Sequence, residues 1–131
     1  MKLHSNGYKI LIVDSSLMIV DRLNNLLSEM SCDNCISSAN NYEEAVEKLL
    51  AEKYDIVLLD TQLQGKNGFE LLSYIKLNCP DTKTVMITNQ TSDFYKMKGK
   101  QIGADHFIDK SGEFEKAVEI VREYTLRYQM N

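Results

Sequence analysis

The sequence predicts an α/β fold in which helices cover both faces of a parallel sheet. Five short, mainly apolar runs have the composition of buried strands, and each is followed by apolar residues at three- or four-residue spacing, as on one face of a helix. Strands that are covered on both faces are typical of parallel sheets. Because right-handed crossovers limit the possible connections, we expect a single doubly wound (βα)5 unit with the flavodoxin-like strand order 2-1-3-4-5.

The predicted strands and helices alternate strictly along the chain. The strands are predicted at residues 8–13, 35–39, 54–60, 84–88 and 105–109. The periodic apolar residues that predict the helices span residues 17–30, 45–50, 69–77, 94–102 and 117–124. The third strand has the clearest signal, because its apolar residues form a continuous run that ends at Asp60.

Polar residues mark where the first three helices begin. Ser15 and Ser16 are both candidate N-caps for the first helix. Asn40 and Asn41 each stand three positions before a glutamate, a spacing that resembles a capping box and opens the second helix. Two glycines and Asn67 predict a loop before the third helix.

The last two helices are delimited in the same way. The only proline, Pro80, separates the third helix from the fourth strand. Residues 91–93, Thr-Ser-Asp, are expected to cap the fourth helix, and Gly103 is expected to end it. Ser111 is expected to cap the fifth helix.

The composition excludes several classes of protein. The chain has 131 residues, 44% of them hydrophobic and 26% charged, which suits one globular domain and does not indicate disorder. A net charge of -4 argues against nucleic acid as the main partner, because phosphate binding needs a basic surface. No apolar run approaches the ~20 residues that span a bilayer. Residues 1–7 contain no hydrophobic signal segment, so we expect a cytoplasmic protein without a membrane partner.

The cysteines are expected to be buried or incidental thiols. Cys32 and Cys35 form a C-x-x-C motif, but the motif lies between a predicted helix and a predicted strand, and a second pair of zinc ligands is absent from the sequence. Cys79 makes the count odd, which disfavours a disulfide framework. The sequence therefore predicts neither a redox centre nor a zinc site.

Four chemically useful side chains stand at strand ends. Asp14 follows the first strand, Asp60 ends the third, Thr88 ends the fourth and Lys110 follows the fifth. Because the carboxyl ends of parallel strands share one edge, we expect these side chains to meet around Asp60. Two carboxylates can hold Mg²⁺ and one can attack phosphorus, while a lysine and a hydroxyl can hold phosphoryl oxygens. The pattern therefore predicts phosphoryl-transfer chemistry.

Together these segments resemble a response-regulator receiver domain of two-component signalling. The similarity extends from about residue 8 to 124 and rests on residues 10–14, 55–60, 67–68, 85–88, 103–105 and 107–110. By this resemblance, Asp60 would accept a phosphoryl group from the phosphohistidine of a histidine kinase or a phosphotransfer protein. Thr88 and Lys110 would contact that group, and Phe107 would be the switch aromatic whose rotamer follows Thr88.

The resemblance also implies a metal site and two tuning positions. Mg²⁺ would be held by Asp14, Asp60 and the backbone carbonyl of Gln62. The side chains of Gln62 and Gln90 would flank the phosphoryl group and tune hydrolysis of the aspartyl phosphate. Any enzymatic activity would be limited to self-phosphorylation and self-dephosphorylation.

The resemblance places the output on one face of the domain. A downstream protein would bind where the fourth helix, fifth strand and fifth helix meet, near Lys96, Lys100 and Phe107. The receiver domain is expected over residues 8–124, with residues 1–7 as an extension and residues 125–131 as the helix end or a tail. Nothing resembling an output domain follows, so we expect a stand-alone receiver or a fragment of a longer regulator or hybrid kinase.

Two departures from the family pattern matter. Ser15 stands where the family has the second of two adjacent acids, commonly a direct metal ligand. We therefore expect weakened Mg²⁺ binding, with Ser15 as a weak ligand or acting through water. Ser111 follows Lys110 where the family often has a cis-proline. Because a cis bond without proline costs roughly 2.5–4 kcal/mol, we expect a trans bond there.

Other functions stay open on the sequence alone. A weakened metal site is compatible with a receiver-like interaction module that acts without phosphorylation. A phosphatase with an aspartyl nucleophile would carry Asp-x-Asp, whereas Asp60 is followed by Thr61 and Gln62. A flavodoxin-like cofactor binder would need a phosphate-binding loop after the first strand, where Asp14 places a negative charge.

Overall fold

The computed structural model describes residues 7–29, 34–90 and 92–130. In these ranges strands and helices alternate along the chain. The strands are β1 (Ile10–Val13), β2 (Ile36–Ala39), β3 (Ile56–Leu59), β4 (Lys83–Thr88) and β5 (His106–Asp109). The helices are α1 (Leu17–Ser28), α2 (Tyr42–Ala51), α3 (Gly68–Asn78), α4 (Asp93–Ile102) and α5 (Phe114–Met130).

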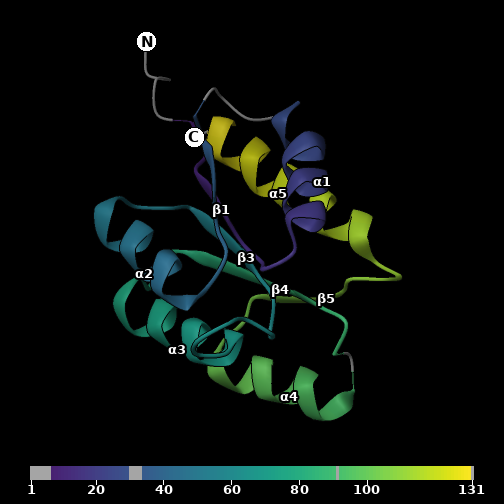
Figure 1. The fold of residues 1–131 in the computed structure, drawn as a ribbon. Coiled ribbons are helices and arrows are strands. Elements are labelled where there is room, and N and C mark those ends of the chain that lie inside the picture. Colours follow the sequence, from purple (N-terminus) through teal and green to yellow (C-terminus); the bar gives the residue numbers. More distant parts are fainter. Residues whose placement is uncertain (1–6, 30–33, 91, 131) are drawn as a thin grey trace.

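The strands form one parallel sheet in the order β2-β1-β3-β4-β5, which confirms the predicted fold class. Helices α1 and α5 cover one face of this sheet, and α2, α3 and α4 cover the other (Figure 1). Val13 of β1 pairs with Leu59 of β3, and Leu59 pairs with Met86 of β4. The carboxyl ends of these strands therefore lie at one edge, where a site can form.

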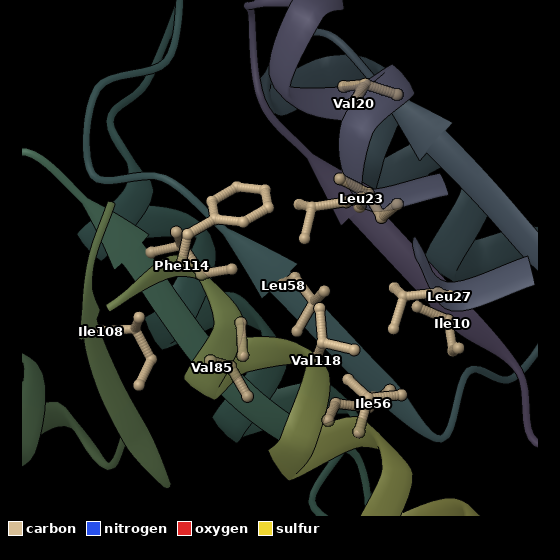
Figure 2. Close-up of a cluster of buried hydrophobic side chains, with 14 of the residues drawn as sticks. Ile10, Val20, Leu23, Leu27, Ile56, Leu58, Val85, Ile108, Phe114 and Val118 are labelled. Carbon is tan, nitrogen blue, oxygen red and sulfur yellow. The ribbon is translucent and has the colours of Figure 1, made fainter. Parts of the chain in front are cut away.

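A hydrophobic cluster fills the space between the sheet and each layer of helices. In the cluster beneath α1 and α5, Leu58 meets Leu23 and Val118 (Figure 2). The next residue of β3, Leu59, points to the opposite face and packs in the cluster that contains Leu72 of α3. Burial of one such side chain contributes about 1.5–3 kcal/mol, so packing of both layers holds the sheet edge in place. None of the helices in the described ranges is long and apolar enough to cross a membrane.

Side-chain caps begin the first three helices, and for α1 and α2 this confirms the prediction from the sequence. Ser16, and not Ser15, is the N-cap of α1. Asn41 caps α2, where its side chain accepts a hydrogen bond of 2.9 Å from the N–H three residues further on. Asn67 caps α3 in a complete capping box with Glu70. These caps fix where each helix starts relative to the preceding strand.

The predicted cap of α5 is wrong. The helix begins at Phe114, and Ser111 lies in the turn before it. The N–H and the hydroxyl of Ser111 donate to Asp109 Oδ1 at 2.9 and 2.8 Å, so this serine closes the turn that carries Lys110. The Lys110–Ser111 peptide bond is trans, which confirms the expectation from the missing proline.

Several positions discussed from the sequence lie outside the described ranges, namely Cys32, Thr91 and residues 1–6, 30 and 131. Ser92 is the N-cap of α4 and makes no side-chain capping hydrogen bond. Cys35 is buried and disulfide-bonded, so the expectation of a thiol at this position is wrong. Cys79 is a free thiol, as expected.

Candidate functional site

Asp14 and Asp60 lie side by side at the carboxyl edge of the sheet. Strands β1 and β3 are paired in register up to Val13 and Leu59, so the next residue of each strand emerges at the same level. Both acids are largely shielded from solvent, with Asp14 4% and Asp60 7% exposed. Two negative charges held together in this way are unfavourable unless a cation accompanies them.

Lys110 provides that cation. Its ammonium nitrogen lies 2.8 Å from Asp14 Oδ2 and 2.7 Å from Asp60 Oδ2. The backbone N–H of Lys110 donates to the carbonyl of Thr88 at 2.9 Å, which ties the residue to the end of β4. Its side chain therefore starts from a fixed point beside β5 and reaches past β4 to both carboxylates.

The protonation of Lys110 follows from these contacts. Burial disfavours the charged ammonium, but the hydrogen bonds and the charges of Asp14 and Asp60 outweigh this effect. The pKa of Lys110 is therefore raised above its ordinary value of 10.5. The lysine stays charged at neutral pH and neutralises part of the charge of the acidic pair.

The remaining oxygen of each carboxylate is held by the backbone. Asp14 Oδ1 accepts a hydrogen bond of 2.8 Å from the N–H of Ser16, at the start of α1. Asp60 Oδ1 accepts one of 3.2 Å from the N–H of Gln62. Backbone N–H groups next to the strand ends thus orient both carboxylates. Phosphoryl transfer needs such preorganised groups.

Thr88 occupies the buried end of β4 beside this pair. Its side chain is fully buried, and its hydroxyl oxygen lies 2.6 Å from the hydroxyl oxygen of Thr61. Thr88 Oγ1 also accepts a hydrogen bond of 3.0 Å from the N–H of Gln90. The sequence does not single out Thr61, because a polar residue after a strand-ending acid has the composition of a loop. The strand register places it, and only the structure gives that register: Leu59 pairs with Met86, so Thr61 lies alongside Thr88.

Gly68 allows α3 to begin directly against the site. Its N–H donates to the carbonyl of Thr61 at 2.8 Å. A Cβ atom at this position would lie 1.9 Å from the carbonyl oxygen of Asp60. Any larger residue would push the start of α3 away from the strand end, so the Asn67-Gly68 turn needs its glycine for this close approach.

The other residues predicted for the site make no side-chain hydrogen bond to its acids or to Lys110 within the described ranges. Ser15 and the side chain of Gln62 are exposed, and Gln90 is half-buried. Phe107 is half-buried on β5 and packs beneath α4, because a Cβ at Gly99 would lie 3.2 Å from its ring. The structure thus brings together Asp14, Asp60, Thr88 and Lys110, with Thr61 added.

The donor set fits Mg²⁺ bound mainly through water. Within the described ranges, no group of three or more His, Cys, Asp or Glu side chains could hold a metal ion. The carboxylates of Asp14 and Asp60 nevertheless lie close together, because one oxygen of each is within 2.8 Å of the Lys110 ammonium nitrogen. Mg²⁺ usually binds through one or two carboxylates and keeps several waters, so this pair is sufficient.

Comparison with known proteins identifies relatives over most of the chain. A family model described as response regulator receiver domain matches residues 10–122. The chain is 35% identical over 113 residues to the sensory transduction protein LytR of Staphylococcus haemolyticus, covering 86% of this chain and 43% of that protein. It is 35% identical over 101 residues to the transcriptional regulatory protein YvrH of Bacillus subtilis, covering 77% and 42%. The chain thus spans less than half the length of these relatives.

Solved structures have the same architecture. The response regulator receiver domain protein from Methanospirillum hungatei superimposes with a TM-score of 0.84 at 25% identity, over 95% of this chain and 98% of that one. The response regulator protein TrrA of Thermotoga maritima, solved in complex with Mg²⁺ and BeF, gives a TM-score of 0.75 at 30% identity, over 88% and 96%.

Proposed function

This chain belongs to the response regulator receiver domain family of two-component signalling, and we propose that it is a phosphorylation-activated switch that accepts a phosphoryl group on Asp60. The observation that carries the proposal is the contact of Lys110 with both Asp14 and Asp60 at a shielded sheet edge. Two-component signalling implies a histidine kinase partner. The phosphoryl donor would be the phosphohistidine of such a kinase or of a phosphotransfer protein.

The transfer would use one carboxylate oxygen of Asp60 as the nucleophile. This oxygen forms a bond to phosphorus while the bond from phosphorus to the histidine nitrogen breaks, and that nitrogen keeps the electron pair. The N–H of Gln62 orients the carboxylate by its hydrogen bond to Oδ1. The Lys110 ammonium, which contacts Oδ2, would follow the negative charge onto a phosphoryl oxygen.

Receiver domains bind Mg²⁺ for phosphorylation, and the TrrA structure contains the ion together with BeF. In this chain Asp14, Asp60 and the backbone carbonyl of Gln62 would hold Mg²⁺, whose charge would neutralise phosphoryl oxygens. Ser15 would contribute weakly or through water, because its side chain is neutral and the residue is exposed.

Replacing Ser15 with aspartate is expected to tighten Mg²⁺ binding about tenfold, a change of 1.4 kcal/mol. Two unit charges about 4 Å apart attract by roughly 4 kcal/mol at an effective dielectric of 20, and solvent at this exposed position leaves only part of that attraction. Titration calorimetry with Mg²⁺ measures the affinity, and Ser15→Asn serves as the neutral control. Equal affinities for the wild type and Ser15→Asp would remove this position from the metal site.

The proposed output surface is the face formed by α4, β5 and α5. On α4, Phe94 is 68% and Met97 61% exposed, and the exposed Lys96 and Lys100 stand beside them. An apolar patch bordered by positive charge suits a protein partner with an acidic rim. Phosphorylation would draw the Thr88 hydroxyl toward the phosphoryl group, and the rearrangement would reach this face through Phe107.

A receiver-like interaction module that works without phosphate is the second candidate. Ser15 favours it, because the missing carboxylate weakens the metal site that phosphorylation requires. Incubation with Mg²⁺ and acetyl phosphate separates the two candidates by intact-protein mass spectrometry. The switch predicts a mass gain of one phosphoryl group that disappears when Mg²⁺ is chelated. If the mass does not change at saturating Mg²⁺, the switch is contradicted and the phosphate-independent module is favoured.

A further inference from the structure

The buried hydroxyl pair of Thr61 and Thr88 connects the end of β3 to the end of β4. The two oxygens are 2.6 Å apart, and the residues are 4% and 0% exposed, so water does not compete for this hydrogen bond. The pairing of Leu59 with Met86 continues beyond β3 and brings the two threonines level with each other. Thr61 follows Asp60 directly, so it links the acid to Thr88.

The available donors and acceptors indicate which of the two hydroxyls donates in this hydrogen bond. Each hydroxyl has one proton to donate, and a buried hydroxyl that cannot donate it loses free energy. The Thr88 oxygen accepts the N–H of Gln90, and among the hydrogen bonds of the described residues only Thr61 offers Thr88 an acceptor. The Thr61 hydroxyl lies 3.5 Å from Asp60 Oδ1, a long contact in which the carboxylate charge still orients the hydroxyl dipole. All protons are used when Thr88 donates to Thr61 and Thr61 points its proton toward Asp60.

We propose that Thr61 is a positioning residue that retains the Thr88 hydroxyl while Asp60 carries no phosphoryl group. This inference rests on the proposed function, in which Thr88 donates to a phosphoryl oxygen. The negative charge of Asp60 orients both hydroxyls in the free protein. When Asp60 is phosphorylated, the negative charge moves outward onto phosphoryl oxygens. The Thr88 hydroxyl then has to break its hydrogen bond to Thr61 in order to donate to a phosphoryl oxygen. The Thr61 hydroxyl therefore opposes activation by the free energy of one buried hydrogen bond.

Beryllofluoride binding, measured with Mg²⁺ present, tests this role without a chemical step. Thr61→Val keeps the shape of the side chain and removes its oxygen, so the free state loses the hydrogen bond and beryllofluoride is expected to bind about two- to tenfold tighter. Thr61→Ser keeps the hydroxyl, and its affinity is expected to stay within about twofold of the wild type. If the valine variant does not fold, Thr61→Ala carries the same expectation as Thr61→Val.

A double-mutant cycle separates positioning from a general effect on packing. In a Thr88→Ala background the hydroxyl that Thr61 retains is missing, so Thr61→Val is expected to leave the beryllofluoride affinity unchanged. An equal gain in both backgrounds, or no gain in the wild-type background, overturns the role of Thr61. A wild-type protein that does not bind beryllofluoride contradicts the proposed function itself, so the two failures are distinguishable.

Discussion

Asparagine in place of Asp60 is expected to abolish the mass gain that acetyl phosphate and Mg²⁺ produce. The amide has nearly the same shape as the carboxylate, and its single oxygen can keep one of the two hydrogen bonds that Asp60 accepts, from Lys110 or from the N–H of Gln62. It lacks the charged oxygen nucleophile, so no acyl phosphate can form. Intact-protein mass spectrometry after a fixed incubation measures the loss.

The matched control is Asp93→Asn, which changes an exposed acid in the first turn of α4. This variant is expected to gain the same mass as the wild type. Urea unfolding shows that both variants are folded before the comparison is made. A phosphoryl gain that persists in Asp60→Asn would place the nucleophile on another residue and contradict the assignment of Asp60.

Methionine in place of Lys110 is expected to lower the free energy of unfolding by about 3 kcal/mol at neutral pH. The substitution keeps an apolar stem but leaves Asp14 and Asp60 as two shielded carboxylates without the cation that contacts both. Removal of one partner of a buried ion pair typically costs 3–5 kcal/mol, and the lower end applies at an edge that water can reach. Mg²⁺ is expected to restore more stability to this variant than to the wild type, because it replaces the missing charge.

The pH dependence of this stability difference has a defined sign. Burial lowers the pKa of Lys110, but Asp14 and Asp60 raise it by a larger amount. The folded-state pKa therefore lies above the ordinary 10.5. A raised lysine pKa stabilises the folded state fully below the unfolded-state pKa, and the contribution is lost as the pH rises through the folded-state value. The difference between the wild type and Lys110→Met should therefore be constant near neutral pH and decrease above about pH 10.5.

Urea unfolding at several pH values measures this difference, and the exposed Lys53 provides a control through Lys53→Met. The control is expected to change stability by less than about 0.5 kcal/mol at any pH. Equal stabilities of the wild type and Lys110→Met would show that the contacts of Lys110 with the two acids contribute nothing to folding.

The apolar runs allowed the sheet and the position of its acidic edge to be predicted from the sequence. The apolar stretch of β3 stops at Asp60, and the apolar residues 85–87 of β4 stop at Thr88, so both strand ends are visible in the sequence. Parallel strands with right-handed crossovers then leave few arrangements of these ends. Residues far apart in the sequence, such as Asp14 and Lys110, could be assigned to one edge for this reason.

Contacts that depend on exact register or on local hydrogen bonds could not be predicted in the same way. Thr61 takes part because β3 and β4 pair so that it stands level with Thr88, and composition carries no information about that alignment. Ser111 was expected to cap a helix, but Asp109 accepts both of its protons and the helix starts later. Ser and Asp side chains can hydrogen-bond to backbone groups in turns as well as at helix N-termini. Only the folded backbone decides which of these two roles a given serine takes.

Locating the phosphoryl group by chemical trapping tests the central assignment most directly. Borohydride reduces an acyl phosphate to an alcohol, so a phosphorylated aspartate becomes homoserine, which peptide mass spectrometry identifies by position. Wild-type protein treated with acetyl phosphate and Mg²⁺ is expected to contain homoserine at position 60 and none when Mg²⁺ is chelated. Homoserine at position 14, or a phosphorylated protein in which Asp60 is unchanged, would contradict the account.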